Sequence, residues 1–249
     1  MSLSEINVRE RNFHNQLHLS GGEDRLQQNK FYKALYSLQI DFLDSLKRKT
    51  KSKDVLDYGC GTGSFTEKVI AFQPKKIVAI DISEEAIKKA KNKPEAENKN
   101  VEYRVENCEN LNLNSDTFDV AYGGGILHHL NLNKSLNELN RVLRKDGTII
   151  FVEPLATNPL INLYRKFTPK ARSKDEHPLI NEDFLLIQKK YKNVKIKYYG
   201  FMTLFFFPFY RNPEKSYFFN ALKNIDQFLF RFKIFRLMAW SVLITAKKS

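Results

Sequence analysis

Apolar residues recur along this chain in two different periods. Over Arg25 to Lys49 they return every three to five positions, which predicts a long amphipathic helix. From Lys53 onward short apolar runs predict strands, with helical patterns at 64–72, 83–92 and 134–144 among them; the strands are expected at 53–58, 76–81, 100–105, 118–122 and 147–153. Strands separated by helices predict a parallel sheet with right-handed crossovers, the doubly wound α/β class.

The rhythm changes after Glu153. Asn158 and Pro159 predict the start of a short helix that ends at Phe167, followed by a polar loop over 168–179 and a helix over 181–191. Two further strands are expected at 194–201 and 237–247, which completes a mostly parallel, seven-stranded, Rossmann-like sheet. The aromatic segment 202–236 between them is long enough to form a cap over the strand ends.

Composition supports one folded unit but divides it by charge. The chain has 249 residues, 42% of them apolar, which is enough for one sizeable core. Its net charge is +13, yet residues 1–150 carry 23 Lys and Arg against 21 Asp and Glu, whereas residues 151–249 carry 18 against 7. The second part also holds 14 of the 20 Phe. A basic and aromatic mixture suits an anionic membrane surface or an amphiphilic partner, and a plain solvated face is the alternative.

Cysteine content and apolar stretches bear on location. Cys60 and Cys108 are too few for a disulfide framework or a four-thiolate zinc site, so we expect neither disulfides nor a metal. Residues 1–16 lack the apolar core of a signal peptide, and the apolar stretches 199–210 and 234–246 are too short to cross a bilayer. We expect a cytoplasmic protein, with peripheral contact at the membrane as the alternative. The oligomeric state stays open.

The strongest local signal is the stretch Val55 to Gly63, VLDYGCGTG, which leads from an apolar strand into a helix. Its three glycines remove the Cβ atoms that would keep a ligand away from the backbone. A dinucleotide-binding fingerprint would have its third glycine at the position of Ser64, and a phosphate-binding loop would have a Lys after Gly63. The acid at Asp57 suits a cationic ligand instead.

This stretch resembles the first motif of the class I S-adenosylmethionine-dependent methyltransferases. The similarity extends over about 50–153 and is closest to the ubiquinone and menaquinone methyltransferase-like group of small-molecule enzymes; Arg141 to Gly147 matches except for Lys and Asp in place of the family's Pro and Gly. The resemblance implies S-adenosylmethionine as methyl donor and S-adenosylhomocysteine as product. The residues that it assigns to the cofactor are Asp57, Gly59, Cys60, Gly61, Gly63, Asp81, Ile82, Asn107, Cys108, Gly123 and Gly124.

Three of these residues have specific implied roles. Asp81 matches the acid that holds the ribose hydroxyls, and one carboxylate accepts two hydrogen bonds from a diol. Asn107 stands where the family usually has an Asp that contacts the adenine amino group, and Cys108 would contact the ring through its backbone. We therefore expect a single methyltransferase domain with a helical cover over 1–50, a cofactor-binding core over 51–153, and substrate-side insertions with the last two strands over 154–249.

Candidate bases follow from the chemistry of methyl transfer. In-line displacement at a sulfonium needs a base only where the acceptor is a poor nucleophile such as a hydroxyl. His128 and His129 follow the fourth strand, where ligands bind in open α/β sheets, and we favour His128 as the one that faces the cleft. Glu153 ends the fifth strand at the same rim. Packing in the turn is the alternative for the histidines, and a bond to the following loop for Glu153.

Two more histidines are candidates through their neighbourhoods. His177 lies in the polar loop, which together with Arg165, Arg172 and Glu176 is our candidate for acceptor recognition; a surface position is the alternative for each. His14 lies in an N-terminal segment that often folds over the cofactor in the resembled family.

Nucleic acid is the acceptor that the sequence excludes. The Pro-Pro tetrapeptide of adenine-amino methyltransferases is missing after the fourth strand, where Tyr122 to Gly125 stand, and no Pro-Cys dipeptide for attack on cytosine occurs. We expect methyl transfer to a small or amphiphilic molecule, at a hydroxyl oxygen. A lipid or quinone at the membrane surface, or a non-catalytic protein that binds S-adenosylmethionine, are the alternatives. Segment 202–236, with Phe205, Phe206, Phe207 and Phe209, is expected to form a mobile apolar cap or to pack on the sheet edge.

Overall fold

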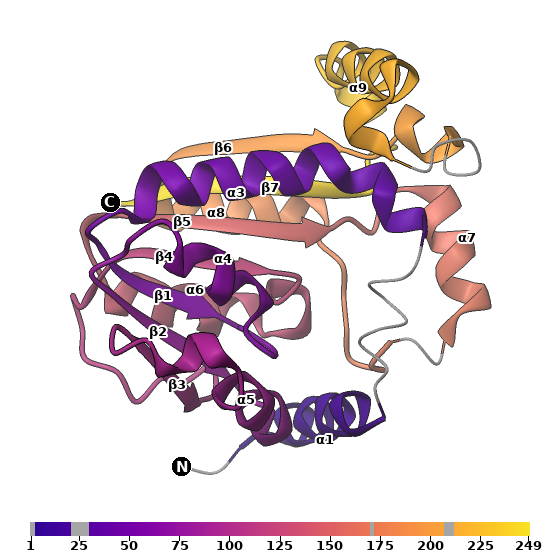
Figure 1. Cartoon of the computed structure of the whole chain (residues 1–249). Coiled ribbons are helices and arrows are strands. Elements are labelled where there is room, and N and C mark those ends of the chain that lie inside the picture. Colours follow the sequence, from indigo (N-terminus) through magenta and orange to yellow (C-terminus); the bar gives the residue numbers. More distant parts are fainter. Residues whose placement is uncertain (1–2, 21–29, 170–171, 207–211) are drawn as a thin grey trace.

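The computed structural model describes residues 3–20, 30–169, 172–206 and 212–249. Seven strands form one sheet in the order β3-β2-β1-β4-β5-β7-β6 (Figure 1). β7 pairs antiparallel with both of its neighbours, and the other pairs of adjacent strands run parallel. The mostly parallel, doubly wound sheet is therefore confirmed. The strands are β1 (Asp54–Tyr58), β2 (Lys76–Asp81), β3 (Val101–Val105), β4 (Phe118–Gly124), β5 (Leu143–Pro154), β6 (Tyr191–Tyr199) and β7 (Ser241–Lys248).

Helices cover both faces of the sheet because successive strand residues point to opposite sides. In β1, Leu56 and Tyr58 join a core built with α6 (Leu132–Val142) and α8 (Asn181–Lys190). Val55 joins the other core, built with α3 (Tyr36–Thr50), α4 (Ser64–Ile70) and α5 (Glu84–Lys91). Figure 1 shows α3 and α4 in front of the sheet and α6 and α8 behind it.

The strand order predicts a ligand crevice at the carboxyl ends of β1 and β4. These neighbours belong to opposite halves of the sheet, and ligands of open α/β sheets bind where the strand order reverses. The glycine-rich loop follows β1, and a short turn, η3 (Leu127–His129), follows β4. The predicted cofactor motif and the predicted base thus leave the sheet from adjacent strands.

The N-terminal region differs from the expected single helix. A helix that the apolar pattern does not predict, α1 (Glu5–Leu19), lies beside α5 (Figure 1). The expected helix over 25–49 is a 3-10 helix, η1 (Lys30–Leu35), followed by α3; residues 21–29 lie outside the described part. Apolar residues recur at similar spacing before and after Leu35, although the chain is a 3-10 helix before it and an α-helix after it. The apolar pattern alone does not distinguish these two geometries.

Some strands after Glu153 begin or end at other residues than the sequence predicts, for local reasons. Strand β6 ends at Tyr199, because Gly200 has a φ of +79° and turns the chain. Strand β7 starts at Ser241 and not at Leu237, since residues 235–239 form hydrogen-bonded turns. The helix α7 (Pro159–Phe167) begins as expected, with Asn158 Oδ1 accepting from the amides of Leu160 and Ile161.

The described residues of segment 202–236 form short helices, and a cap over the strand ends stays a prediction. These are η5 (Met202–Phe206), η6 (Pro213–Lys215), α9 (Tyr217–Leu229) and α10 (Lys233–Arg236). Phe219 and Leu222 of α9 are buried, whereas Tyr217, Phe218, Ile225 and Phe228 are exposed, so α9 presents an apolar outer face. Figure 1 shows α9 projecting beyond the sheet edge. Phe207 and Phe209 lie outside the described residues. No helix in the described ranges combines the length and apolar character that a bilayer crossing requires.

Candidate functional site

The glycine-rich loop holds an open space at one position. Gly61 has a φ of +53°, and a Cβ built on it would meet no protein atom within 4 Å. The two glycines around it are different: a Cβ on Gly59 would lie 2.5 Å from Ile126, and one on Gly63 would lie 2.9 Å from the Tyr103 hydroxyl. Gly59 and Gly63 therefore permit packing within the protein, whereas Gly61 leaves room for a ligand against the backbone.

Gly123 and Gly124, predicted to contact the cofactor, are explained by packing. A Cβ on Gly123 would lie 2.5 Å from the backbone oxygen of Tyr58, and one on Gly124 would lie 3.2 Å from the Phe65 ring. The close approach of β1 thus requires glycine at position 123 whatever ligand binds, and the Phe65 ring of α4 leaves little room for a side chain at position 124.

Asp81 holds the loop and keeps acceptor capacity. Its Oδ2 accepts from the Gly61 amide at 2.9 Å, and its Oδ1 accepts from the Ser83 amide at 2.9 Å. Each carboxylate oxygen has a second lone pair. Asp81 ends β2 beside the open space at Gly61, and the half-buried Ile82 follows it. This arrangement of a carboxylate and an open glycine fits a ligand with vicinal hydroxyls, as the resemblance implies.

Asn107 and Cys108 form a tight turn after β3. Oδ1 of Asn107 accepts from the Glu109 amide at 3.0 Å, and its Nδ2 donates to Asn7 Oδ1 at 3.3 Å. The Tyr58 hydroxyl donates to the carbonyl of the buried Cys108. The implied contact of Asn107 with an adenine amino group would use the remaining lone pair of its oxygen.

Asp57 lies deeper than a surface ligand contact would require. Its Oδ2 accepts from the hydroxyls of Thr66 and Tyr122, both at 2.6 Å. Burial raises the pKa of this carboxyl to about 6. Cys60 is also buried, and burial raises the pKa of its thiol. Asp57 therefore anchors the start of α4 to β4, and an attraction for a cationic ligand stays a prediction.

Helix α1 turns a polar face toward the protein. Its buried residues are Asn7, Glu10 and His18, which recur at helical spacing. On the cofactor side, Asn7 contacts Asn107, and Asn15 Oδ1 accepts from the Ser83 hydroxyl at 2.6 Å. A helix that buries amides and a carboxylate packs against polar groups, and these belong to the rim of the crevice.

A carboxylate and imidazole pair lies where β4 and β5 end. Nδ1 of His128 is 2.8 Å from Oε2 of Glu153, which is fully buried. Oε1 of Glu153 also accepts from the amides of Ile126 and Leu127, at 3.0 and 2.9 Å. An ionised Glu153 is acceptor-only, so Nδ1 of His128 carries the proton and Nε2 is left as the basic nitrogen. Glu153 faces the turn, and its part toward an acceptor is to position His128.

A second group of polar side chains joins α1 to the same turn. Oε2 of Glu10 lies 3.1 Å from His129 Nδ1 and 3.5 Å from His14 Nε2. Burial disfavours the charged form of Glu10, yet its neighbours His129, His14 and Ser173 outweigh burial and lower the pKa of its carboxyl. Burial lowers the pKa of His129 to about 4. Glu10 is thus an ionised carboxylate that faces the neutral imidazole ring of His129.

The polar loop after α7 closes over this group. The Ser173 hydroxyl donates to Glu10 Oε1, and Arg9 pairs with Asp175 at 2.8 Å. The His177 amide donates to the His128 carbonyl at 2.8 Å, but the His177 side chain is exposed. Of the predicted bases, the structure brings His14, His128 and Glu153 into one region, whereas the ring of His177 lies apart from them.

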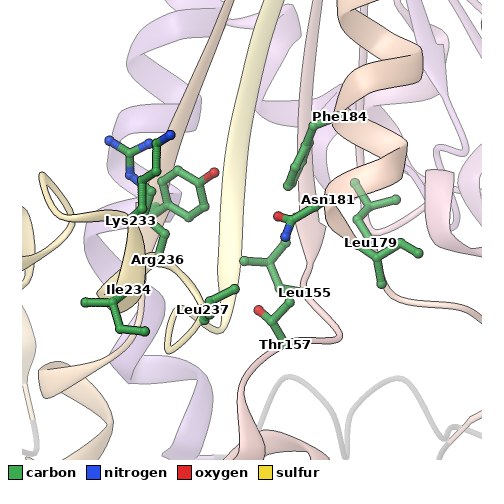
Figure 2. A pocket seen from close by; sticks show the side chains of 11 residues that line it. Leu155, Thr157, Leu179, Asn181, Phe184, Lys233, Ile234, Arg236 and Leu237 are labelled. Carbon is green, nitrogen blue, oxygen red and sulfur yellow. The ribbon is translucent and has the colours of Figure 1, made fainter.

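Two cavities lie on opposite sides of a short bridge between Leu155 and Leu179. One, of about 470 Å³, is lined by Arg165, Arg172, Ser173 and Glu176 and so adjoins the histidines. The predicted grouping of Arg165, Arg172 and Glu176 is thus present, with His177 outside it. The other, of about 430 Å³, is the pocket in Figure 2, where Leu155 and Thr157 face Ile234 and Leu237. Successive side chains of the extended chain point to opposite sides, so Leu155 and Thr157 face the 430 Å³ cavity and Ala156 between them faces the 470 Å³ cavity.

Sequence reasoning missed Asn7 and Glu10. Their signal is the spacing of Asn7, Glu10 and His14 by three and four residues, which puts them on one helix face. A search for apolar periodicity overlooks a helix whose buried face is polar.

The comparisons with known proteins agree with this geometry. A sequence profile described as a methyltransferase domain matches residues 56–151. An uncharacterized protein of Methanocaldococcus jannaschii is 39% identical over 125 residues, 49% of this chain and 45% of that protein. A malonyl-[acyl-carrier protein] O-methyltransferase of Bacillus cereus is 31% identical over 152 residues, 60% of this chain and 54% of that protein. The matches thus span about half the length of these relatives.

Among solved structures, a Thermotoga maritima protein described as a methyltransferase, possibly acting on histamine nitrogen, superposes with a TM-score of 0.61. It is 16% identical and aligns over 95% of this chain and all of its own. At this identity the likeness supports the fold. The first motif, the strand order and the sequence profile point to the same kind of domain.

Proposed function

We propose that this chain, whose residues 56–151 match a methyltransferase-domain profile, is a class I S-adenosylmethionine-dependent methyltransferase that transfers a methyl group to a hydroxyl oxygen of a small or amphiphilic acceptor. The observation that carries the choice of oxygen is the His128–Glu153 pair, at 2.8 Å between Nδ1 and Oε2. A buried carboxylate that fixes the tautomer of an imidazole is the arrangement that a general base for a hydroxyl requires.

The residues of the crevice divide the work between donor and acceptor. S-adenosylmethionine, when bound, supplies an electrophilic methyl group. The glycine-rich loop gives it backbone access at Gly61, and Asp81 accepts from hydroxyls of its ribose. His128 takes the acceptor proton on Nε2 as the oxygen attacks, and Glu153 stabilises the imidazolium that forms. Ile126, two residues before His128, lies against Gly59, so the base stands beside the cofactor loop.

The lining of the 470 Å³ cavity favours a particular acceptor. Arg165, Arg172 and Lys174 bring positive charge to it, and Glu176 offsets part of that charge through its 3.0 Å pair with Arg172. Guanidinium groups bind carboxylates and phosphates through paired hydrogen bonds. We therefore infer an acceptor that carries an anionic group in addition to its hydroxyl.

The test is a screen for turnover. Purified protein, methyl-labelled S-adenosylmethionine and fractionated metabolite extract should give a labelled product, detected by mass spectrometry. His128→Ala should lower the rate of product formation by roughly 100- to 10,000-fold and leave the affinity for S-adenosylhomocysteine unchanged. A full-rate variant would mean that the acceptor needs no base. Binding of the donor without product in any fraction would instead support a non-catalytic protein.

A second candidate acceptor is a lipid or quinone at a membrane surface. The observation that favours it is the outer face of α9, where Tyr217 is 93% exposed and Phe228 is 55% exposed. Lys223, Arg231 and Lys233 lie on the same segment. Aromatic side chains flanked by cations suit an anionic bilayer, to which each cation near the surface adds about 1 kcal/mol.

A further inference from the structure

Three ligand-type side chains meet between α1 and the turn after β4. Glu10 and His14 come from successive turns of α1, and His129 comes from η3. One ligand atom from each lies within 4.8 Å of the other two. The Glu10 Oε2 atom is 3.1 Å from His129 Nδ1 and 3.5 Å from His14 Nε2.

The two central atoms lack hydrogen bonds. In the described part of the chain, Glu10 Oε2 and His129 Nδ1 are both buried and neither has a hydrogen-bond partner, although the two face each other. The Glu10 side chain is only 5% exposed. Buried polar atoms of native proteins are nearly always partnered, and two such atoms aimed at the same point indicate a missing partner. A cation would satisfy both.

We propose that Glu10, His14 and His129 bind a divalent first-row transition metal ion. Two imidazoles and one carboxylate are the donor set that zinc, iron(II), manganese and cobalt share, and calcium or magnesium would prefer all-oxygen ligands. With metal–ligand bonds of about 2.0 to 2.1 Å, adjacent ligand atoms lie about 2.9 to 3.4 Å apart. The separation of 3.1 Å between Glu10 and His129 lies within this range, and that of 3.5 Å between Glu10 and His14 lies just above it.

The surroundings resemble the outer shell of a metal site. The Ser173 hydroxyl donates to Glu10 Oε1 and so fixes the orientation of the carboxylate. His128, His129 and Glu176 form an adjoining group of possible metal ligands. In that group, however, Glu176 already pairs with Arg172, and His128 already pairs with Glu153. The ligand set is therefore the first group, which leaves coordination positions open toward the acceptor cavity. The expectation of no metal was based on cysteine number, and these ligands are not cysteines.

Metal binding is tested with the ion alone, so the outcome does not depend on an acceptor. Untagged protein, dialysed against a chelator, is titrated with Co²⁺ by visible absorption and with Zn²⁺ by calorimetry. We expect one ion per chain, with Co²⁺ bands that report nitrogen and oxygen ligands. Glu10→Gln and His14→Ala should each weaken Zn²⁺ binding by at least about tenfold. His177→Ala is the matched control, an exposed histidine nearby that should keep wild-type affinity.

Three results would overturn the proposal. The first is that neither ion binds. The second is that wild type, Glu10→Gln and His14→Ala bind Zn²⁺ with equal affinity, and the third is that His177→Ala loses binding. Absence of binding would mean that Glu10, His14 and His129 form only a network of ion pairs. Circular dichroism of each variant shows that it is folded. His14→Ala provides a second route if Glu10→Gln fails to fold, because His14 is half-buried and its removal leaves Glu10 with Ser173 and His129 as neighbours.

Discussion

Glu153→Gln is the change that probes the site most directly. The carboxylate accepts from four N–H groups: the amides of Ile126, Leu127 and His128, and the His128 ring. A glutamine of the same shape replaces one oxygen by an amino group that faces two of these donors. Hydrogen bonds to a charged group contribute about 1.5 to 3 kcal/mol each and do not add fully, so the free energy of unfolding should fall by about 3 to 5 kcal/mol. The melting temperature should drop by roughly 6 to 20 °C.

Two assays separate this effect from simple destabilisation. Proton NMR of the wild type should show a low-field imidazole N–H resonance from His128, and Glu153→Gln should lose or shift it upfield. In the labelled-product assay, turnover of the folded variant should fall by roughly 100- to 10,000-fold.

The control is Glu138→Gln on α6. Glu138 accepts from the Leu111 amide at 2.7 Å and pairs with Arg141, so it belongs to a different hydrogen-bond network from His128. It should lose stability yet keep both the resonance and the turnover. The reasoning would be refuted if Glu153→Gln lost less than about 1 kcal/mol, or if it retained the His128 signal and full turnover.

Four further outcomes follow from the structure. Asp81→Asn should weaken S-adenosylhomocysteine binding by about 2 to 4 kcal/mol, roughly 30- to 700-fold, in calorimetry, because the charged acceptor of the ribose hydroxyls is lost. Gly61→Ala should weaken the same binding by at least about tenfold, because the added methyl group occupies the space left for the ligand. It should lower the free energy of unfolding by only about 1 to 2 kcal/mol, from its left-handed φ of +53°, since the methyl group meets no protein atom. Full-length protein should sediment with anionic vesicles at low salt, and Phe228→Ser on the exposed face of α9 should weaken this. Burial raises the pKa of Asp57 to about 6, above its ordinary value of 3.8, so the folded state binds the proton more tightly than the unfolded state does. The free energy of unfolding should therefore decline by about 3 kcal/mol as the pH rises from about 4 to about 6. Chemical denaturation of Asp57→Asn should show no such dependence on pH.

Each of these four predictions has a control. Asp116→Asn, at an exposed carboxylate far from the loop, should leave cofactor affinity unchanged. Gly123→Ala should lose stability outright because of the 2.5 Å approach to Tyr58, unlike Gly61→Ala. Leu185→Ser, on the exposed side of α8, should not alter vesicle binding. Equal effects within any of these pairs, or a pH slope that survives in Asp57→Asn, would contradict the corresponding explanation.

The parts of the fold that could be predicted are those that a local pattern determines. The strand that ends at Tyr58 and the cap at Asn158 follow from apolar runs and from side-chain hydrogen bonding over three residues. The cofactor loop followed from glycine spacing, although the spacing did not distinguish Gly61, which is open to a ligand, from Gly59 and Gly123, which are small because neighbours touch them.

The rest depends on contacts between distant segments. The approach of Glu10 to His129 joins residues more than a hundred positions apart, and no period in the sequence encodes it. The sequence favours His128 over His129 as the residue that faces the cleft, whereas the structure places a carboxylate close to each ring: Glu153 beside His128 and Glu10 beside His129. The cap was expected as a unit, but which of its aromatics are buried follows from Asp226, which draws the amides of residues 201–203 onto α9.

The polar face of α1 has a kinetic consequence. Through Asn7 and Asn15 the helix is bonded to the rim of the donor site, and through Glu10 it is bonded to the loop that borders the acceptor cavity. A movement of this fifteen-residue element on one side would therefore break its contacts on the other side as well. Donor and acceptor affinities are then linked, each changing the other by an equal factor. We expect the opening of α1 to limit turnover, so that S-adenosylhomocysteine departs more slowly than the methyl group is transferred.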